Sequence, residues 1–213
     1  MRLKHCSIAC GALAVLLTAC QGGGGQSETA QPAGEAEAPD PTPTIVLETS
    51  KGRIVMELDR EKAPITVANF VAHVQIGFFN GLTFHRVRPG FMIQAGKYTA
   101  EMQGRSSSAG NLMNEADNGL SNLRGTVAMA RLPDPHSATT QFFINVVDNQ
   151  KLDYGTASDG WGYAVFGHVV EGMDVVDAIV AVPARRVGRF EALPIEPVVI
   201  TSAYVAEEEE ASP

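Results

Sequence analysis

The chain has 213 residues and carries 16 basic against 24 acidic side chains, a formal charge of −8 at pH 7. A chain with this acidic excess repels phosphate backbones, so we expect it to bind no nucleic acid. Hydrophobic residues make up 45% of the chain, which favours an ordinary packed core over a disordered protein.

Residues 1–19 have the features of a secretory signal. Arg2 and Lys4 form a basic start, and a mostly apolar run follows from Cys6 to Ala19. This run is too short to span a bilayer, which takes about 20 residues. A basic start, a short apolar stretch and small residues before a break are typical of a signal that is removed on export.

The break at Leu17-Thr18-Ala19-Cys20 resembles the lipobox of bacterial lipoproteins. The resemblance implies that the thiol of Cys20 is lipidated and that the chain is cut just before it. An ordinary signal peptide followed by a chance cysteine is the alternative. Cys6 and Cys10 would leave with the signal, so the mature chain would have no second cysteine for a disulfide. Two or three acyl chains on Cys20 would make anchoring in the membrane effectively permanent.

The residue after the lipidated cysteine bears on localisation. It is Gln21 rather than Asp, which in Gram-negative lipoproteins predicts transport to the outer membrane, facing the periplasm. In a Gram-positive host the same anchor would hold the protein on the outer face of the plasma membrane.

The composition divides the rest of the chain into three parts. Residues 20–43 contain the lipidated cysteine and a Gly/Pro-rich stretch that predicts a flexible linker. Residues 44–205 are long enough for a single domain with a full core. Residues 206–213 form a short acidic tail, which we expect to be disordered.

Apolar residues alternate with polar ones from Ile45 to Leu58, which predicts a β-hairpin with its turn at Ser50-Lys51-Gly52. A helix is predicted from Pro64 to about Ile76, and a second one from Met173 to Val180. Further short strands are predicted at Thr83–Val87, Met92–Ala95, Thr126–Ala130, Phe142–Val146, Ala164–Val169 and Val198–Tyr204. Many short strands with few helices indicate a closed antiparallel barrel or a sandwich.

Several motifs occur in the order and spacing of one known family. They are Phe84-His85-Arg86-Val87 with Pro89–Gln94, Gly125–Ala130 with Thr140–Asn145, and Tyr163–Gly167 with Gly172–Val176. Together they resemble the cyclophilins, and the similarity extends from about Ile45 to Val205. The motif Asn114-Glu115-Ala116 and the compact loops are most similar to the bacterial periplasmic members.

The resemblance implies a mainly β fold, a closed eight-stranded antiparallel barrel capped by two α-helices. It also implies peptidyl-prolyl cis/trans isomerase activity on proline-containing peptides, with no cofactor and no metal. The predicted export of the chain adds unfolded exported proteins as the expected substrates. Rotation about an Xaa-Pro bond is slow because the partial double bond must be broken. An enzyme for this reaction has to hold the proline ring and stabilise the twisted amide.

Arg86 matches the family residue that performs the second task. Its guanidinium is always charged and offers several fixed donors, so it suits the prolyl carbonyl and the pyramidal nitrogen. Donors aimed at a feature that is stronger in the transition state lower the barrier. A surface salt bridge, the usual role of an arginine, is the alternative.

The resemblance assigns the remaining site residues. The catalytic set is Arg86, Gln94 and Phe143, and the substrate-binding set is Phe91, Met92, Ala130, Arg131, Gln141, Leu152 and Tyr163. An apolar pocket of Phe91, Met92, Phe143 and Leu152 holds the proline ring. Gln94 and Gln141 bind substrate backbone or brace Arg86. Ala130 and Arg131 lie on a strand whose backbone pairs with the peptide, so we expect their side chains to be free to vary.

Three positions depart from the best-known family pattern. Lys151 stands where many members have Trp, Tyr163 where many have His, and Arg131 where Asn is common. Loss of the aromatic side chain at position 151 predicts weak cyclosporin binding with catalysis preserved. Trp161, in a glycine-flanked loop, either packs on the barrel rim, which we take as the default, or reaches the edge of the pocket; the sequence does not decide between these.

Two other kinds of chemistry are disfavoured by spacing. Asp134, His136 and Ser137 suggest a hydrolase, but they crowd into one turn, whereas triad members converge from distant parts of a chain. The four histidines that follow the signal show no paired spacing of the kind that binds zinc.

A non-catalytic role is the serious alternative. The same groove would serve a peptide-binding holdase or a docking module of the cell envelope. The intact set around Arg86 favours catalysis, because a pure binder has no need of the arginine. We expect a monomer, as is usual in the family.

Overall fold

A computed structural model describes residues 40–206. The signal sequence, Cys20, most of the predicted linker and residues 207–213 of the acidic tail lie outside the described residues. Within residues 40–206, no helix has the length and apolar character needed to cross a membrane. The elements are β1 (Thr44–Thr49), β2 (Gly52–Leu58), α1 (Pro64–Gln75), β3 (Arg86–Arg88), β4 (Met92–Ala95), β5 (Thr126–Met129), β6 (Phe142–Asn145), a 3-10 turn (Gln150–Leu152), β7 (Val165–Glu171), α2 (Met173–Val180), β8 (Ala184–Val187), β9 (Phe190–Pro194) and β10 (Ile200–Val205).

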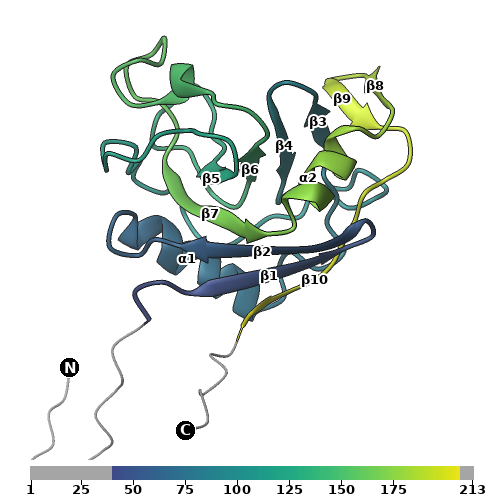
Figure 1. Cartoon of the computed structure of the whole chain (residues 1–213), viewed down its shortest axis with the longest axis horizontal. Coiled ribbons are helices and arrows are strands. Elements are labelled where there is room, and N and C mark those ends of the chain that lie inside the picture. The colour runs from purple at the N-terminus through teal and green to yellow at the C-terminus, as the bar shows by residue number, and fades with distance from the viewer. Residues whose placement is uncertain (1–39, 207–213) are drawn as a thin grey trace, which may run out of the picture. The chain divides into compact units, whose positions relative to one another are not determined.

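Eight strands form one antiparallel, strongly curled sheet in the order β10-β1-β2-β7-β5-β6-β4-β3. Figure 1 shows the β1–β2–β10 layer below and the β3–β4 and β5–β6 strands above, joined by the long strand β7. The prediction of a mainly β fold with eight antiparallel strands and two helices is confirmed. The two ends of the strand order, β10 and β3, are not neighbours in the sheet.

The prediction of a fully closed barrel is therefore wrong, and the sheet is an open half-barrel. Along the seam, Thr83 and Val199 form an isolated bridge outside any named strand pair, and three backbone hydrogen bonds of 2.8–2.9 Å join residues 81–84 to residues 198–200. Pro197 precedes this short stretch and has no amide hydrogen to donate, which limits the ladder. The strand expected at 83–87 is accordingly reduced to β3.

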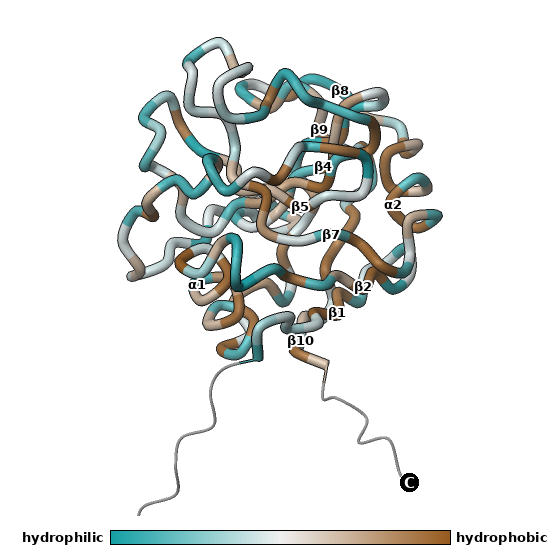
Figure 2. Tube along the Cα trace, turned by 60° about the vertical axis from the view of Figure 1, so that its left-hand side comes forward, coloured by the Kyte–Doolittle hydropathy of each residue, from teal (hydrophilic) through white to brown (hydrophobic). Residues whose placement is uncertain are grey.

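The core lies inside the curled sheet because apolar side chains point inward at alternate positions. Ile45 and Leu47 of β1 and Ile54, Met56 and Leu58 of β2 are all buried. Figure 2 shows the hydrophobic positions concentrated along β1, β2, β7 and α2.

Helix α1 covers one end of the core. It starts with Pro64 at its first turn, and Gly77 follows it with a φ of 68°, a conformation that favours glycine. Both carboxylate oxygens of Glu115 accept amide hydrogens of its first turn, at 3.0 Å from Ile65 and 2.8 Å from Thr66. Helix α2 has the bounds that the sequence predicts.

The hairpin of β8 and β9 was not expected from the sequence. All four residues of β8 are exposed, so the segment lacks the alternation by which strands are recognised. Its turn contains Gly188, with a φ of 56°. The hairpin lies beside β3, in the upper right of Figure 1, and so borders the strand that carries Arg86.

Candidate active site

The three residues predicted to be catalytic form one row across neighbouring strands. Arg86 of β3 is paired with Gln94 of β4, and Gln94 is paired with Phe143 of β6. Directly paired residues in a sheet project from the same face. The adjacent residues Val87 and Ile93 point the other way and are fully buried in the main core. Strand alternation therefore presents this row on the outer face of the sheet.

A second, smaller apolar cluster lies on that outer face. It consists of Met92, Ala128, Phe143 and Val165, against which Phe91, Leu120, Ala130, Leu152 and Tyr163 pack. This cluster forms the floor of a pocket of about 140 Å³. The pocket is lined by Arg86, Phe91, Met92, Gln94, Ala130, Arg131, Phe143, Leu152 and Tyr163.

The structure thus brings nine of the ten predicted site residues together at this pocket. The tenth, Gln141, lies beside it and accepts a hydrogen bond from Gln94 Nε2 at 3.1 Å. A larger hollow of about 530 Å³ lies between residues 50–51, 182–183 and 195–197, but it contains none of the motif residues. Size alone does not indicate a functional site, so we place the candidate site at the smaller pocket, where the predicted residues lie.

Three cations approach the ring of Phe91 at the pocket mouth. The guanidinium carbons of Arg86 and Arg88 lie 6.0 and 5.4 Å from the ring centre, and Lys151 Nζ lies 5.3 Å from it. Lys151 therefore covers the same ring with a charge, where many family members place an aromatic side chain. Such contacts are worth about 0.5–1 kcal/mol at exposed positions.

The side chain of Arg86 is about one-third exposed, so its guanidinium is within reach of a bound peptide. Its one carboxylate partner among residues 40–206 is Glu191 of β9, at 3.5 Å. That contact is long and exposed, and exposed ion pairs contribute little to stability. Sequence reasoning missed Glu191 because the hairpin that carries it was not recognised.

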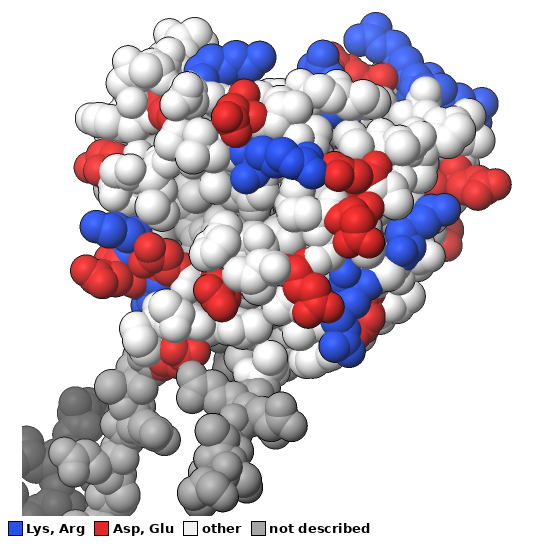
Figure 3. Space-filling view, in the orientation of Figure 1, with Lys and Arg blue, Asp and Glu red and all other residues white. Residues whose placement is uncertain are grey.

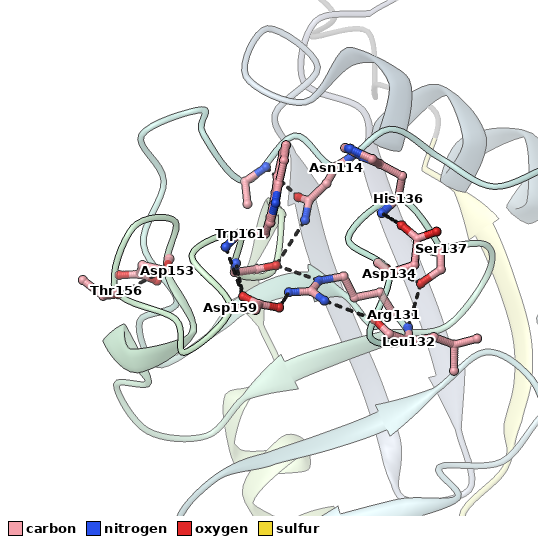
Figure 4. A network of polar contacts seen from close by, with 12 residues as sticks. Asn114, Arg131, Leu132, Asp134, His136, Ser137, Asp153, Thr156, Asp159 and Trp161 are labelled. Atoms are coloured by element: carbon pink, nitrogen blue, oxygen red, sulfur yellow. Dashed lines mark hydrogen bonds and ion pairs between the residues drawn. The ribbon is translucent and has the colours of Figure 1, made fainter.

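Arg131 lines the pocket, but its side chain makes contacts that the sequence did not predict. Its side chain is only 3% exposed, so it is not free to vary. Nε donates to the Gly162 carbonyl at 2.8 Å, the guanidinium lies 4.6 Å from the ring centre of Tyr163, and NH2 pairs with Asp159. Figure 4 shows this side chain reaching from the segment after β5 to the loop that carries Asp159 and Trp161.

The hydrogen bond from Arg131 lowers the pKa of Asp159 to about 2, and the amides of Trp161 and Gly162 add to this effect. Asn114 Nδ2 donates to the same Gly162 carbonyl at 3.1 Å. These hydrogen bonds to the Gly162 carbonyl matter for the pocket because the next residue, Tyr163, forms part of the pocket wall. The Tyr163 amide donates to the Leu152 carbonyl at 2.9 Å. Arg131 therefore holds the pocket wall in place.

A buried chain of polar side chains supports the pocket from below. Asn149 Nδ2 donates to the Phe91 carbonyl and to Asn145 Oδ1, both at 2.8 Å. Asn145 Nδ2 donates to Asn122 Oδ1 at 3.2 Å, and Asn122 Nδ2 donates to Asp153 at 2.9 Å. This chain fixes the backbone around Phe91 and the turn that carries Leu152. Its members were missed because buried asparagines give no periodic signal in a sequence.

His85 is almost fully buried next to Arg86. Its ring packs edge-on against Tyr98 with ring centres 4.9 Å apart. Burial lowers its pKa to about 4, and the neighbouring charges of Arg86 and Lys97 act in the same direction. Its Nδ1 has no hydrogen-bond partner within the described part of the chain.

The hydrolase alternative finds no relay in the Pro133–Ser137 turn. The Ser137 hydroxyl donates to the Asp134 carbonyl at 2.5 Å, and His136 Nδ1 accepts from the Asn114 amide at 3.1 Å. Both side chains are thus engaged in holding the loop. Trp161 packs edge-on against His136 at 4.8 Å between ring centres and lies outside the set that lines the pocket.

Comparisons with known proteins show the family of the chain. Residues 44–205 match the family described as cyclophilin type peptidyl-prolyl cis-trans isomerase/CLD. The chain is 54% identical to peptidyl-prolyl cis-trans isomerase cyp18 of Streptomyces antibioticus over 76% of this chain and 98% of that one. It is 49% identical to peptidyl-prolyl cis-trans isomerase B of Escherichia coli strain K12, over 76% and 99%.

A solved structure shares the fold. A cyclophilin-type isomerase of Cryptosporidium parvum, crystallised in the presence of the dipeptide Ala-Pro, superposes with a TM-score of 0.67 and 23% identity over 77% of this chain and 99% of that one. The chain belongs to the cyclophilin-type peptidyl-prolyl cis-trans isomerases. Its activity is the cis-trans isomerisation of peptidyl-prolyl bonds.

Proposed function

We propose that the pocket on the outer face of the sheet holds the proline ring and that Arg86 stabilises the twisted prolyl amide. The observation that supports this best is the row of Arg86, Gln94 and Phe143 across three strands, at the edge of an apolar floor. Phe143 and Met92 supply the apolar surface, and Gln94, held by Gln141, stands beside the arginine.

The physics of the reaction assigns the arginine its task. Rotation about the amide has a barrier of about 18–20 kcal/mol, because resonance between nitrogen and carbonyl is lost at the top. The nitrogen then regains its lone pair and becomes an acceptor, which a guanidinium can satisfy. This interaction does not exist in the planar ground state, so it accelerates rotation rather than merely tightening binding. Loss of one such preorganised donor costs about 100-fold to 1000-fold in other enzymes.

The test is cis/trans exchange in an Ala-Pro peptide, followed by NMR without a coupling protease. The full-length protein is compared with Arg86→Ala and with Arg53→Ala, which removes an exposed arginine at the β1–β2 hairpin. We expect Arg86→Ala to lose at least about 100-fold in catalysed exchange and Arg53→Ala to lose nothing. Equal exchange in all three proteins would remove Arg86 from the proposed role.

We also propose that the protein acts on unfolded exported proteins from a lipid anchor in the cell envelope. The support is the signal-like segment and the lipobox-like Leu17–Cys20. Gln21 after the cysteine favours the outer membrane, and a monomer is the expected state. In cells grown with labelled palmitate, the wild-type chain should take up label and sediment with membranes. A Cys20→Ser variant that stays labelled and membrane-bound would contradict this proposal.

Two departures from the family pattern support the alternative of a non-catalytic peptide binder. Lys151, in place of the usual aromatic side chain, and the Arg131 substitution both alter the groove. A holdase would bind the Ala-Pro peptide while exchange stayed at its uncatalysed rate in both the wild type and Arg86→Ala. The exchange measurement therefore separates the two functions.

A further inference from the structure

A second hollow adjoins the proposed proline pocket on the side of the β8–β9 hairpin. It has a volume of about 380 Å³ and shares Arg86 and Gln94 with the first pocket. Its other walls are His85, Tyr98, Gln141, Arg189, Phe190 and Glu191. Because two of its residues belong to both sites, a peptide with its proline in the first pocket passes beside the second.

The back wall of this hollow is aromatic and holds an arginine in place. The rings of Tyr98 and Phe190 meet edge-on with centres 5.1 Å apart, and His85 packs against Tyr98. The guanidinium of Arg189 lies 5.6 Å from the Tyr98 ring centre and 5.2 Å from that of Phe190. It also donates to the Tyr98 hydroxyl at 3.3 Å. A guanidinium that is already positioned loses less freedom when it binds a ligand.

No carboxylate of residues 40–206 pairs with Arg189. Most of the other charged side chains at the walls of the two hollows are also cations, namely Arg86, Arg88, Lys97, Arg131, Lys151 and Arg186. The carboxylates that meet them are Glu191, which pairs with Arg86 and Arg186, and Asp159, which pairs with Arg131. This basic surface stands out on a chain whose formal charge is −8. In Figure 3 basic side chains gather along the upper edge, over the hairpin and the nearby strand ends.

The hollow already accommodates one carboxylate. Glu191 lies 3.5 Å from Arg86 and 3.8 Å from Arg186, and its side chain is about half exposed. The contacts are long, so a carboxylate from a ligand can compete for the same cations. Arginine is the side chain best suited to such recognition, because its planar fork matches a carboxylate.

We propose that this second hollow binds an acidic side chain of the substrate, close to the proline, and gives the enzyme a preference for prolines flanked by Asp or Glu. Arg189 is the principal specificity residue, and Glu191, which pairs with Arg86 and Arg186, places an opposing negative charge in the same hollow. The inference rests on the proposed placement of the proline in the first pocket. It concerns specificity only, and the stabilisation of the twisted amide remains with Arg86.

The test uses short peptides built around Ala-Pro. Glu is placed either two residues before the proline or directly after it, and each peptide has a matched version with Gln at that position. NMR exchange with the full-length protein gives the ratio of kcat/KM for the Glu and Gln versions. We expect a ratio of about five at one position or both, which corresponds to an exposed charge pair at the upper end of its usual strength. The ratio should fall towards one as salt is raised from about 0.05 to about 0.5 M. Salt screens the interaction between exposed charges, and the Debye length is already only about 10 Å at 0.1 M.

Variants assign the effect to the hollow. Arg189→Gln should bring the ratio close to one, and Glu191→Gln should raise it. The control Arg53→Gln removes the same charge far from the hollow and should leave the ratio unchanged. Ratios of one at both positions in the wild type, or an unchanged ratio in Arg189→Gln, would overturn the inference. Catalysis of the Gln peptides reports on the proposed function separately, and its absence in the wild type would overturn both.

Discussion

Replacing Arg131 by Ala is the sharpest test of how the pocket wall is held. The side chain is nearly buried and connects the segment after β5 to the 159–163 loop through three contacts. They are the ion pair with Asp159, the hydrogen bond to the Gly162 carbonyl and the stacking over the Tyr163 ring. The variant removes all three and leaves the Gly162 carbonyl with the Asn114 amide group as its donor.

The expected loss of stability follows from these contacts. The hydrogen bond to the carbonyl is worth about 1 kcal/mol. The ion pair is discounted to at most about 1 kcal/mol, because the Asp159 side chain is 40% exposed and screened by solvent. The contact with the ring adds about 0.5–1 kcal/mol. We therefore expect Arg131→Ala to lower the free energy of unfolding by about 2–3 kcal/mol.

Urea denaturation measures this change, with Arg53→Ala as the control for the loss of an exposed ion pair. A second readout is the carboxyl titration of Asp159 by NMR. Its pKa of about 2 should return towards the usual value of 3.8 in the variant. A stability loss no larger than that of Arg53→Ala, with the Asp159 pKa unchanged, would refute the idea that Arg131 holds the wall.

Three further predictions concern other parts of the site. Burial lowers the pKa of His85 to about 4 from 6.5, so between these values the unfolded chain binds a proton that the folded one does not. The free energy of unfolding should therefore fall by about 3 kcal/mol as the pH drops from 6.5 to 4. The dependence of this free energy on pH should be weaker in His85→Phe, and an unchanged dependence would contradict the assignment to His85. Gly162→Ala would place a Cβ 2.5 Å from the Leu152 carbonyl oxygen at a φ of 68°. We expect Gly162→Ala to lower the free energy of unfolding by about 2–3 kcal/mol and to weaken the affinity for an Ala-Pro peptide in an NMR titration. Wild-type values for both would show that the loop adapts to the added methyl group. Lys151→Trp should raise cyclosporin affinity measured by calorimetry, with exchange on Ala-Pro preserved; equal affinity would show that position 151 is not decisive.

Much of the fold could be predicted from the sequence because its strongest signals are local. The β1–β2 hairpin alternates cleanly, and both helices have a clear start or stop, so their positions were confirmed. The β8–β9 hairpin could not be predicted, because its first strand is exposed on both faces and carries charge. Closure of the sheet was also overestimated. Whether two edge strands meet depends on Pro197 and on the path of the chain around Thr83, which no local pattern encodes.

The site likewise has residues that the sequence predicts and residues that it does not. The motif residues around Arg86 could be named because the family pattern places them, and strand alternation brings them to one face. The supporting residues could not, since their roles depend on contacts between distant segments. Asp159 lies 28 residues from Arg131 and Glu191 lies 105 residues from Arg86. The Asn145–Asn149 chain beneath Phe91 was missed for the same reason.

We propose that Arg86 acts on the transition state rather than on the bound ground state. NMR line shapes of an Ala-Pro peptide titrated with Arg86→Ala give both the dissociation constant and the exchange rate on the enzyme. We expect a dissociation constant within about threefold of the wild type, because exposed contacts contribute little to binding, and an on-enzyme rate lower by at least about 100-fold. A weakened affinity with an unchanged on-enzyme rate would contradict it, because Arg86 would then contribute binding alone.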